Sequence, residues 1–290
     1  MKINPLTARL CLWCSATLTL VGIILRTVAM FISFDSKVGY FNPSLLTTLM
    51  TVVSFAAVLL SAVLCIVIRK DTLPQIWPSP RRHLAPVFPF ALFASSSIGV
   101  LWYYATEGQS NTTMVLTGIL GLVSAIYYLL LILQSAGKGI GTNALAAIGY
   151  APVLWSLLAV AETYTDQFTT MNSPIKLSLQ FGFLSIALMM VAELRFLLNK
   201  PAPRAALYFH AIALYFCLTG SIPTLLALGA GILNNPLHGA YALALLGVGI
   251  YAAFKLVCYF TISASEITPS ETSAPEAHET DSDTNHIIGE

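Results

Sequence analysis

The stretch PSLLTTLMTVVSFAAVLLSAVLCIVI, residues 43–68, contains no charged residue. About 20 consecutive apolar residues are enough for a helix to cross the hydrocarbon core of a bilayer. A helix of a water-soluble protein rarely reaches this length without a polar face. The stretch therefore predicts a membrane-spanning helix and places the chain among membrane proteins.

Seven further stretches of the 290-residue chain have a similar composition, and hydrophobic residues make up 57% of the whole against 9% for charged residues. In hydrocarbon the backbone polar groups must satisfy one another, and a helix does this within a single segment. We therefore expect an all-α membrane protein with eight transmembrane helices. The predicted spans are 10–34, 43–68, 85–105, 113–134, 144–164, 175–198, 205–231 and 240–262.

The basic residues are distributed unevenly over the predicted loops. One side of the membrane would carry nine of them and the other side two, and the side richer in lysine and arginine faces the cytoplasm. We therefore expect both termini in the cytoplasm. The nine are Lys2, Arg9, Arg69, Lys70, Arg81, Arg82, Lys138, Lys200 and Arg204, and the two are Lys37 and Lys176.

Residues 263–290 differ in composition from the rest of the chain. They hold seven of the thirteen acidic residues and are poor in aromatic side chains. Such a segment buries too little apolar surface to offset the entropy lost on ordering. We expect a disordered, acidic cytoplasmic tail, either simply solvated or acting as a docking segment for a protein partner. An acidic tail behind a basic membrane body does not indicate nucleic-acid binding.

Short matches between the two halves of the chain suggest an internal repeat. The motif PSPR at 78–81 follows the second predicted span, and PAPR at 201–204 follows the sixth. These matches predict two parallel four-helix repeats, residues 1–138 and 139–262, related by an axis along the membrane normal. The alternative is that the prolines only end one helix and begin the next.

Three ionisable residues lie at a similar depth within the last three predicted spans. Glu193, His210 and Lys255 are each roughly 9–12 Å inside the inner boundary at the helical rise of about 1.5 Å per residue. Ionisable groups inside a span are costly and call for a partner or a function. We regard the three as a candidate polar pocket that is proton-linked or binds an anion. The alternatives are a structural brace or three separate side chains that reach toward water.

Two further features lie within predicted spans. Arg26 and Glu162 occupy the outer halves of the first and fifth spans and form a candidate intramembrane ion pair. Alternatively, Arg26 extends to a lipid phosphate and Glu162 to water. Pro223 lies in the middle of the seventh span and is a candidate helix kink, because proline removes a backbone hydrogen bond.

The sequence lacks the motifs of common catalytic sites. It has no Walker loop, no HExxH, no GxSxG and no aspartate-rich prenyltransferase motif. Cys11 and Cys14 form a CxxC inside the first span, where thiols usually pack as small apolar groups, and no second pair completes a metal site. We therefore expect neither an enzyme nor a bound metal or cofactor.

Three short motifs carry a resemblance to a known group of proteins. They are NSPIK at 172–176, ELRF at 193–196 and PAPR at 201–204. This region, roughly spans five to seven, resembles uncharacterised multi-pass membrane proteins of anaerobic Gram-positive bacteria. The resemblance implies a bacterial inner membrane and carries over no activity and no functional residue.

Two classes of function remain open at this point. A small-molecule or ion carrier is favoured by the repeat, by Pro223 and by the candidate pocket at Glu193, His210 and Lys255. A non-enzymatic scaffold, sensor or assembly partner is favoured by short loops, sparse polarity within the spans and the acidic tail. A water-accessible cavity that reaches the middle of the membrane would favour the carrier, and a solid core would favour the partner.

The loop charges make a direct prediction about topology. A reporter enzyme that is active only in the periplasm, fused after Glu290, should give no activity, because the basic loops keep the C-terminus in the cytoplasm. A cytoplasm-active reporter at the same position is the matched control. Strong activity of the periplasmic reporter would overturn the predicted orientation.

Overall fold

The structure is a computed structural model, and it describes residues 5–35, 38–67, 85–107, 112–166, 170 and 173–265. The helices are α1 (Pro5–Ile32), α2 (Leu45–Val67), α3 (Val87–Glu107), α4 (Thr112–Ser135), α5 (Thr142–Ile148), α6 (Tyr150–Thr165), α7 (Pro174–Leu197), α8 (Pro203–Gly229) and α9 (Pro236–Ser265). Two short antiparallel strands, β1 (Phe34–Asp35) and β2 (Tyr40–Phe41), connect α1 to α2. Eight segments are long and apolar enough to cross a membrane, which confirms the predicted all-α, eight-span class.

The fifth span is divided, where the sequence predicted one helix over 144–164. The chain turns at Gly149, between α5 and α6. Pro152 has no amide hydrogen and cannot bond the carbonyl of Ile148 one turn earlier, which weakens the helix at this point. Together α5 and α6 still form one span of 24 residues.

Proline begins each of the last three helices. Pro174, Pro203 and Pro236 are the first residues of α7, α8 and α9. Proline suits this position because the first amide of a helix has no partner within it. The PAPR motif therefore marks the start of α8, and its predicted counterpart at 78–81 lies outside the described residues.

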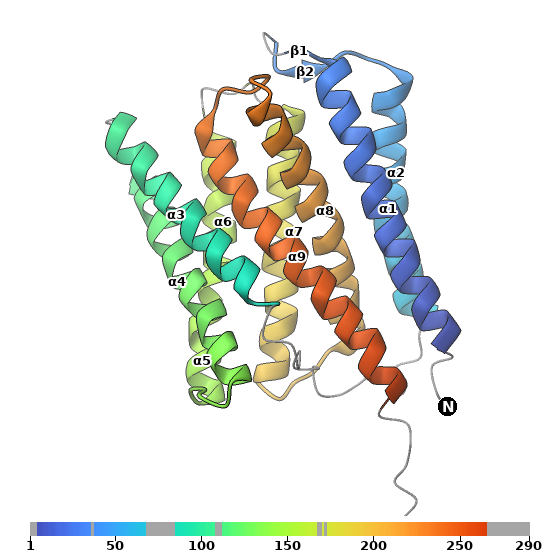
Figure 1. The fold of residues 1–290 in the computed structure, drawn as a ribbon, viewed down its shortest axis with the longest axis vertical. Coiled ribbons are helices and arrows are strands. Elements are labelled where there is room, and N and C mark those ends of the chain that lie inside the picture. The colour runs from blue at the N-terminus through green and yellow to red at the C-terminus, as the bar shows by residue number, and fades with distance from the viewer. Residues whose placement is uncertain are drawn as a thin grey trace, which may run out of the picture.

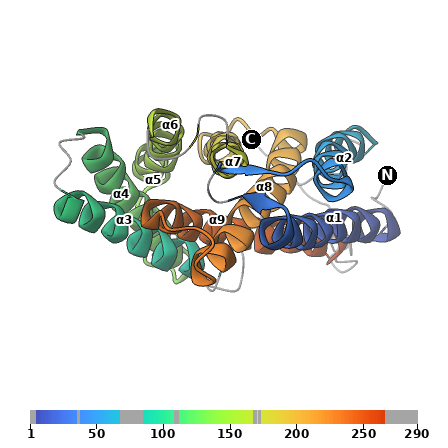
Figure 2. The same cartoon turned by 90° about the horizontal axis from the view of Figure 1, so that it is seen from above.

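The helices form one bundle in which α7, α8 and α9 are central (Figure 1). Seen from above, α1 and α2 lie at one end of the bundle and α3 to α6 at the other (Figure 2). The beginning of α1 and the end of α9 lie on the same face, as an even number of spans requires (Figure 1). We call this the terminal face and the other the opposite face. The final helix continues to Ser265, beyond its predicted end at 262, and the rest of the predicted tail lies outside the described residues.

The predicted parallel repeat is not supported, because its second and sixth spans occupy different environments. The α2 span is an edge helix that packs on α1 and α8, and 11% of its residues are buried. Its predicted counterpart, α7, packs between α6 and α8 and is 67% buried. Of the two matching motifs, the described one, PAPR, is accounted for by the preference of proline for a helix start.

Pro223 lies inside α8 without interrupting it, since the helix continues from Pro203 to Gly229. The residue is buried, and the Thr224 hydroxyl beside it donates to the Gly220 carbonyl at 2.7 Å. The predicted proline position is thus part of a continuous helix.

Buried aromatic rings fill the middle of the bundle. The Trp155 ring lies 4.6 Å from the Phe93 ring and 5.4 Å from the Phe183 ring, centroid to centroid. Tyr128 contacts Phe93 at 5.7 Å and Tyr251 at 5.4 Å. Edge-to-face and offset aromatic contacts at these distances are favourable and rigid. This aromatic core separates two groups of polar side chains, one toward each face.

Candidate functional site

The structure brings Glu193, His210 and Lys255 together from α7, α8 and α9. Glu193 Oε1 lies 2.9 Å from His210 Nε2 and 3.9 Å from Lys255 Nζ. All three residues are buried, with at most 6% of their surface exposed. The matched depth of the three residues in the sequence therefore corresponds to a real cluster near the terminal face.

The surroundings of His210 require one proton between its ring and Glu193. Its Nδ1 lies 2.7 Å from the Ala206 carbonyl oxygen, which can only accept, so Nδ1 carries a hydrogen. The contact between Nε2 and Glu193 Oε1 also needs a hydrogen, which belongs either to an imidazolium or to a carboxylic acid. In both arrangements the charges of His210 and Glu193 sum to zero.

Tyr251 completes the cluster and was missed by the sequence analysis. Its hydroxyl donates to Glu193 Oε2 at 3.1 Å, and its ring lies 5.3 Å from Lys255 Nζ. An ammonium group at this distance from an aromatic face is attracted to it. The sequence spacing could have indicated this contact, because Tyr251 and Lys255 are four residues apart and share one face of a helix.

A cavity of about 210 Å³ opens beside this cluster. At about 30 Å³ for each water molecule, its volume corresponds to a small solute rather than a large one. It is lined by residues of α4, α7 and α9 and by Pro86, and the central rings of Phe93 and Trp155 are not part of its lining. Its polar lining consists of Tyr127, Gln134, Ser135, Glu193, Tyr251 and Lys255.

The described charged residues at this cavity carry a net positive charge. Glu193 is the acidic residue among those that line it and Lys255 the basic one, with His210 behind Glu193. Since the charges of His210 and Glu193 sum to zero, a protonated Lys255 gives these three residues together a charge of +1. A buried excess charge is costly unless an opposite charge neutralises it.

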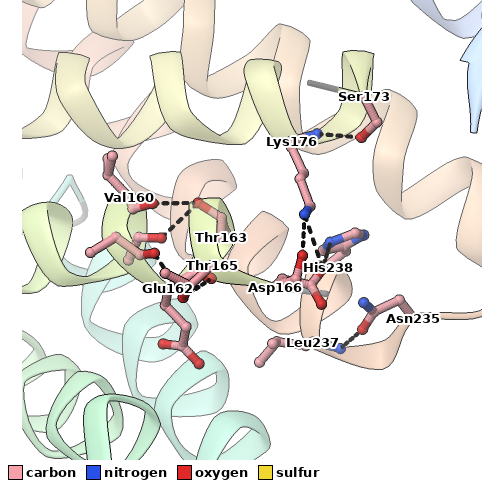
Figure 3. Close-up of polar contacts among 12 residues, drawn as sticks. Val160, Glu162, Thr163, Thr165, Asp166, Ser173, Lys176, Asn235, Leu237 and His238 are labelled. Atoms are coloured by element: carbon pink, nitrogen blue, oxygen red, sulfur yellow. Dashed lines mark hydrogen bonds and ion pairs between the residues drawn. The ribbon is translucent and has the colours of Figure 1, made fainter. Parts of the chain in front are cut away.

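A second polar cluster lies toward the opposite face (Figure 3). Asp166, at the end of α6, places Oδ2 at 3.9 Å from Lys176 Nζ and 3.7 Å from His238 Nε2. The Lys176 ammonium also donates to the Asp166 carbonyl. Lys176 was counted from the sequence among the basic residues of the loops on this side, and it is 3% exposed in the first turn of α7. The cluster joins the ends of three helices.

The predicted ion pair between Arg26 and Glu162 does not form. Arg26 Nη2 donates instead to the Pro174 carbonyl at 2.8 Å. Glu162 accepts a hydrogen bond from Tyr241 on α9. The reason is helix placement, because α1 packs on α8 and α2 whereas α6 packs on α4 and α7.

Among the residues that the structure describes, no group of three or more His, Cys, Asp or Glu side chains could hold a metal ion. The Cys14, Cys65, Cys217 and Cys258 thiols are free of disulfide bonds. Comparisons with protein families, with curated proteins and with solved structures found no match. The fold defines the class of the protein, a polytopic helical membrane protein with eight spans.

The Glu193 cluster makes a prediction about stability. Glu193→Ala should lower the free energy of unfolding by about 1–3 kcal/mol, because it leaves buried donors without an acceptor. Combining it with Lys255→Met should cost less than the sum of the two single changes, since the residues interact. Unfolding in detergent micelles gives all three values.

Arg195→Ala is the matched control, because Arg195 is exposed near Glu193 on α7 and should change stability little. If the stability losses of Glu193→Ala and Lys255→Met simply add in the double variant, the two residues do not interact.

Proposed function

We propose that this protein is a carrier for a small monovalent organic anion, which binds in the cavity beside Lys255, and that it is not an enzyme. The proposal rests on the net charge of +1 that Glu193, His210 and Lys255 hold next to a cavity of about 210 Å³. A carboxylate in this cavity would neutralise the net charge that Glu193, His210 and Lys255 carry together.

The hydrogen bonds of Glu193 support an anion rather than a cation as the ligand. Its Oε1 faces both His210 and Lys255, and its Oε2 accepts from Tyr251. The carboxylate is therefore already surrounded by positive and donor groups of the protein. A cation in the cavity would meet the ammonium of Lys255 and the excess positive charge.

Access from one face supports a carrier rather than an open channel. The cavity ends at the aromatic core, and the Asp166, Lys176 and His238 cluster ties helix ends together on the other side of it. A carrier exposes its binding site to one side of the membrane at a time. The solid aromatic core also suits the competing function, a scaffold, sensor or assembly partner, which would bind no solute.

The basic residues of the loops predict the side of the membrane to which the cavity opens. With both termini in the cytoplasm of a bacterial cell, the cavity would open toward the cytoplasm, because the last turns of α4 and α7 lie at the terminal face (Figure 1). The protein would lie in the inner membrane. The acidic tail would remain available there to a protein partner.

Binding of simple anions tests the proposed function. Acetate, L-lactate and benzoate should raise the unfolding temperature of the purified protein in detergent. For at least one of them, this increase should level off as the anion concentration rises. A ligand at 100 times its Kd stabilises the bound state by about 2.7 kcal/mol. Lys255→Met should abolish the stabilisation because it removes the excess charge, whereas Lys255→Arg should keep part of it.

Lys138→Met is the control, since Lys138 is an exposed lysine in the loop after α4. Choline, a cation, should have no effect. No stabilisation by any of the three anions, or equal stabilisation of the Lys255→Met variant, would refute the carrier and favour the scaffold.

A further inference from the structure

Glu162 is a second buried carboxyl group that the anion site does not use. It lies on α6, and 3% of its surface is exposed. Its Oε1 is buried and has no hydrogen-bond partner among the residues that the structure describes. Figure 3 shows its carboxyl group directed away from the Asp166, Lys176 and His238 cluster, although Asp166 is only one helical turn further along the chain.

The charged groups around Glu162 do not neutralise it. Lys176 on α7 and His238 on α9 both pair with Asp166. The facing helix α4 contains no charged residue between Thr112 and Ser135. Within the described part of the chain, no lysine, arginine or histidine forms an ion pair with Glu162. An ionised carboxylate would therefore be an isolated buried charge, which is costly.

The printed hydrogen bonds satisfy only one oxygen of the Glu162 carboxyl group. Tyr241 donates its hydrogen to Glu162 Oε2. Thr117, on the facing helix α4, directs its hydroxyl hydrogen to the Thr113 carbonyl at 2.8 Å and therefore donates none to Glu162.

We infer that Glu162 is a proton-binding site and holds a proton in this conformation. A carboxylic acid at this position accepts from Tyr241 with one oxygen and buries no charge, whereas an ionised group would have no counter-ion among the described residues. An ionised carboxylate would instead leave Oε1 without a donor in an apolar surrounding. The site is rigid, because the Tyr241 ring packs against Trp155 at 6.2 Å and Phe183 at 5.4 Å.

This inference deepens the proposed function and rests on it for one step, the role of the proton. In an anion carrier, a proton bound at Glu162 on the far side of the aromatic core would move together with the anion. The pair would then cross the membrane without net charge. The proton site itself follows from the hydrogen-bond geometry alone.

Infrared spectroscopy tests the site without any transport measurement. The protein in lipid vesicles at neutral pH should show the C=O stretching band of a protonated carboxylic acid, and the band should shift in D₂O. Glu162→Gln should abolish the component of this band that belongs to Glu162. The variant should unfold at nearly the wild-type temperature, because the amide has nearly the same shape, is also uncharged and can also accept from Tyr241.

Two controls separate Glu162 from the other buried acids. Asp166→Asn should leave the band unchanged, since Asp166 forms ion pairs with two basic side chains. Glu193→Gln identifies any contribution from the carboxyl group beside His210. A band that is the same in wild type and Glu162→Gln would overturn the proton site. Because no anion is present, that result would leave the proposed anion carrier intact.

Discussion

A carboxylate can be buried within a membrane bundle only if donors and positive charges surround it, and Glu193 meets this condition by joining three helices. His210 approaches from α8, and Tyr251 and Lys255 approach from α9. The geometry of His210, with its second nitrogen on the Ala206 carbonyl, fixes one proton inside the cluster. The packing of the central helices near the terminal face and the charge of the cavity both depend on this arrangement.

The two buried glutamates lie on opposite sides of one aromatic core. The rings connect through a series of contacts that runs from Tyr251 through Tyr128, Phe93 and Trp155 to Tyr241. The tyrosine at each end donates its hydroxyl hydrogen to a glutamate. A core of packed rings excludes water and resists small displacements. Movement of a solute past it would therefore require the helices that carry these rings to shift as bodies.

The sequence predicts well how deep a residue lies in the membrane, and it predicts poorly which helices pack side by side. Apolar length predicted the eight spans, and counting residues from the span ends placed Glu193, His210 and Lys255 at one level. The same reasoning paired Arg26 with Glu162, which is wrong because helix packing puts their helices on different sides of the bundle. The predicted repeat is unconfirmed, and short apolar and proline motifs do not encode which helix packs on which. The tyrosine donors escaped notice because aromatic residues are common in spans.

Uptake into sealed vesicles measures movement of the anion that the charged cavity is proposed to bind. The purified protein would be reconstituted into liposomes, and entry of radiolabelled L-lactate, acetate and benzoate would be followed with an acidic exterior. An anion carrier should give saturable uptake of at least one anion above that of protein-free liposomes, and this uptake should be lost when Lys255 is replaced by methionine. Uptake of all three anions at the rate of protein-free liposomes would show that the protein does not carry them.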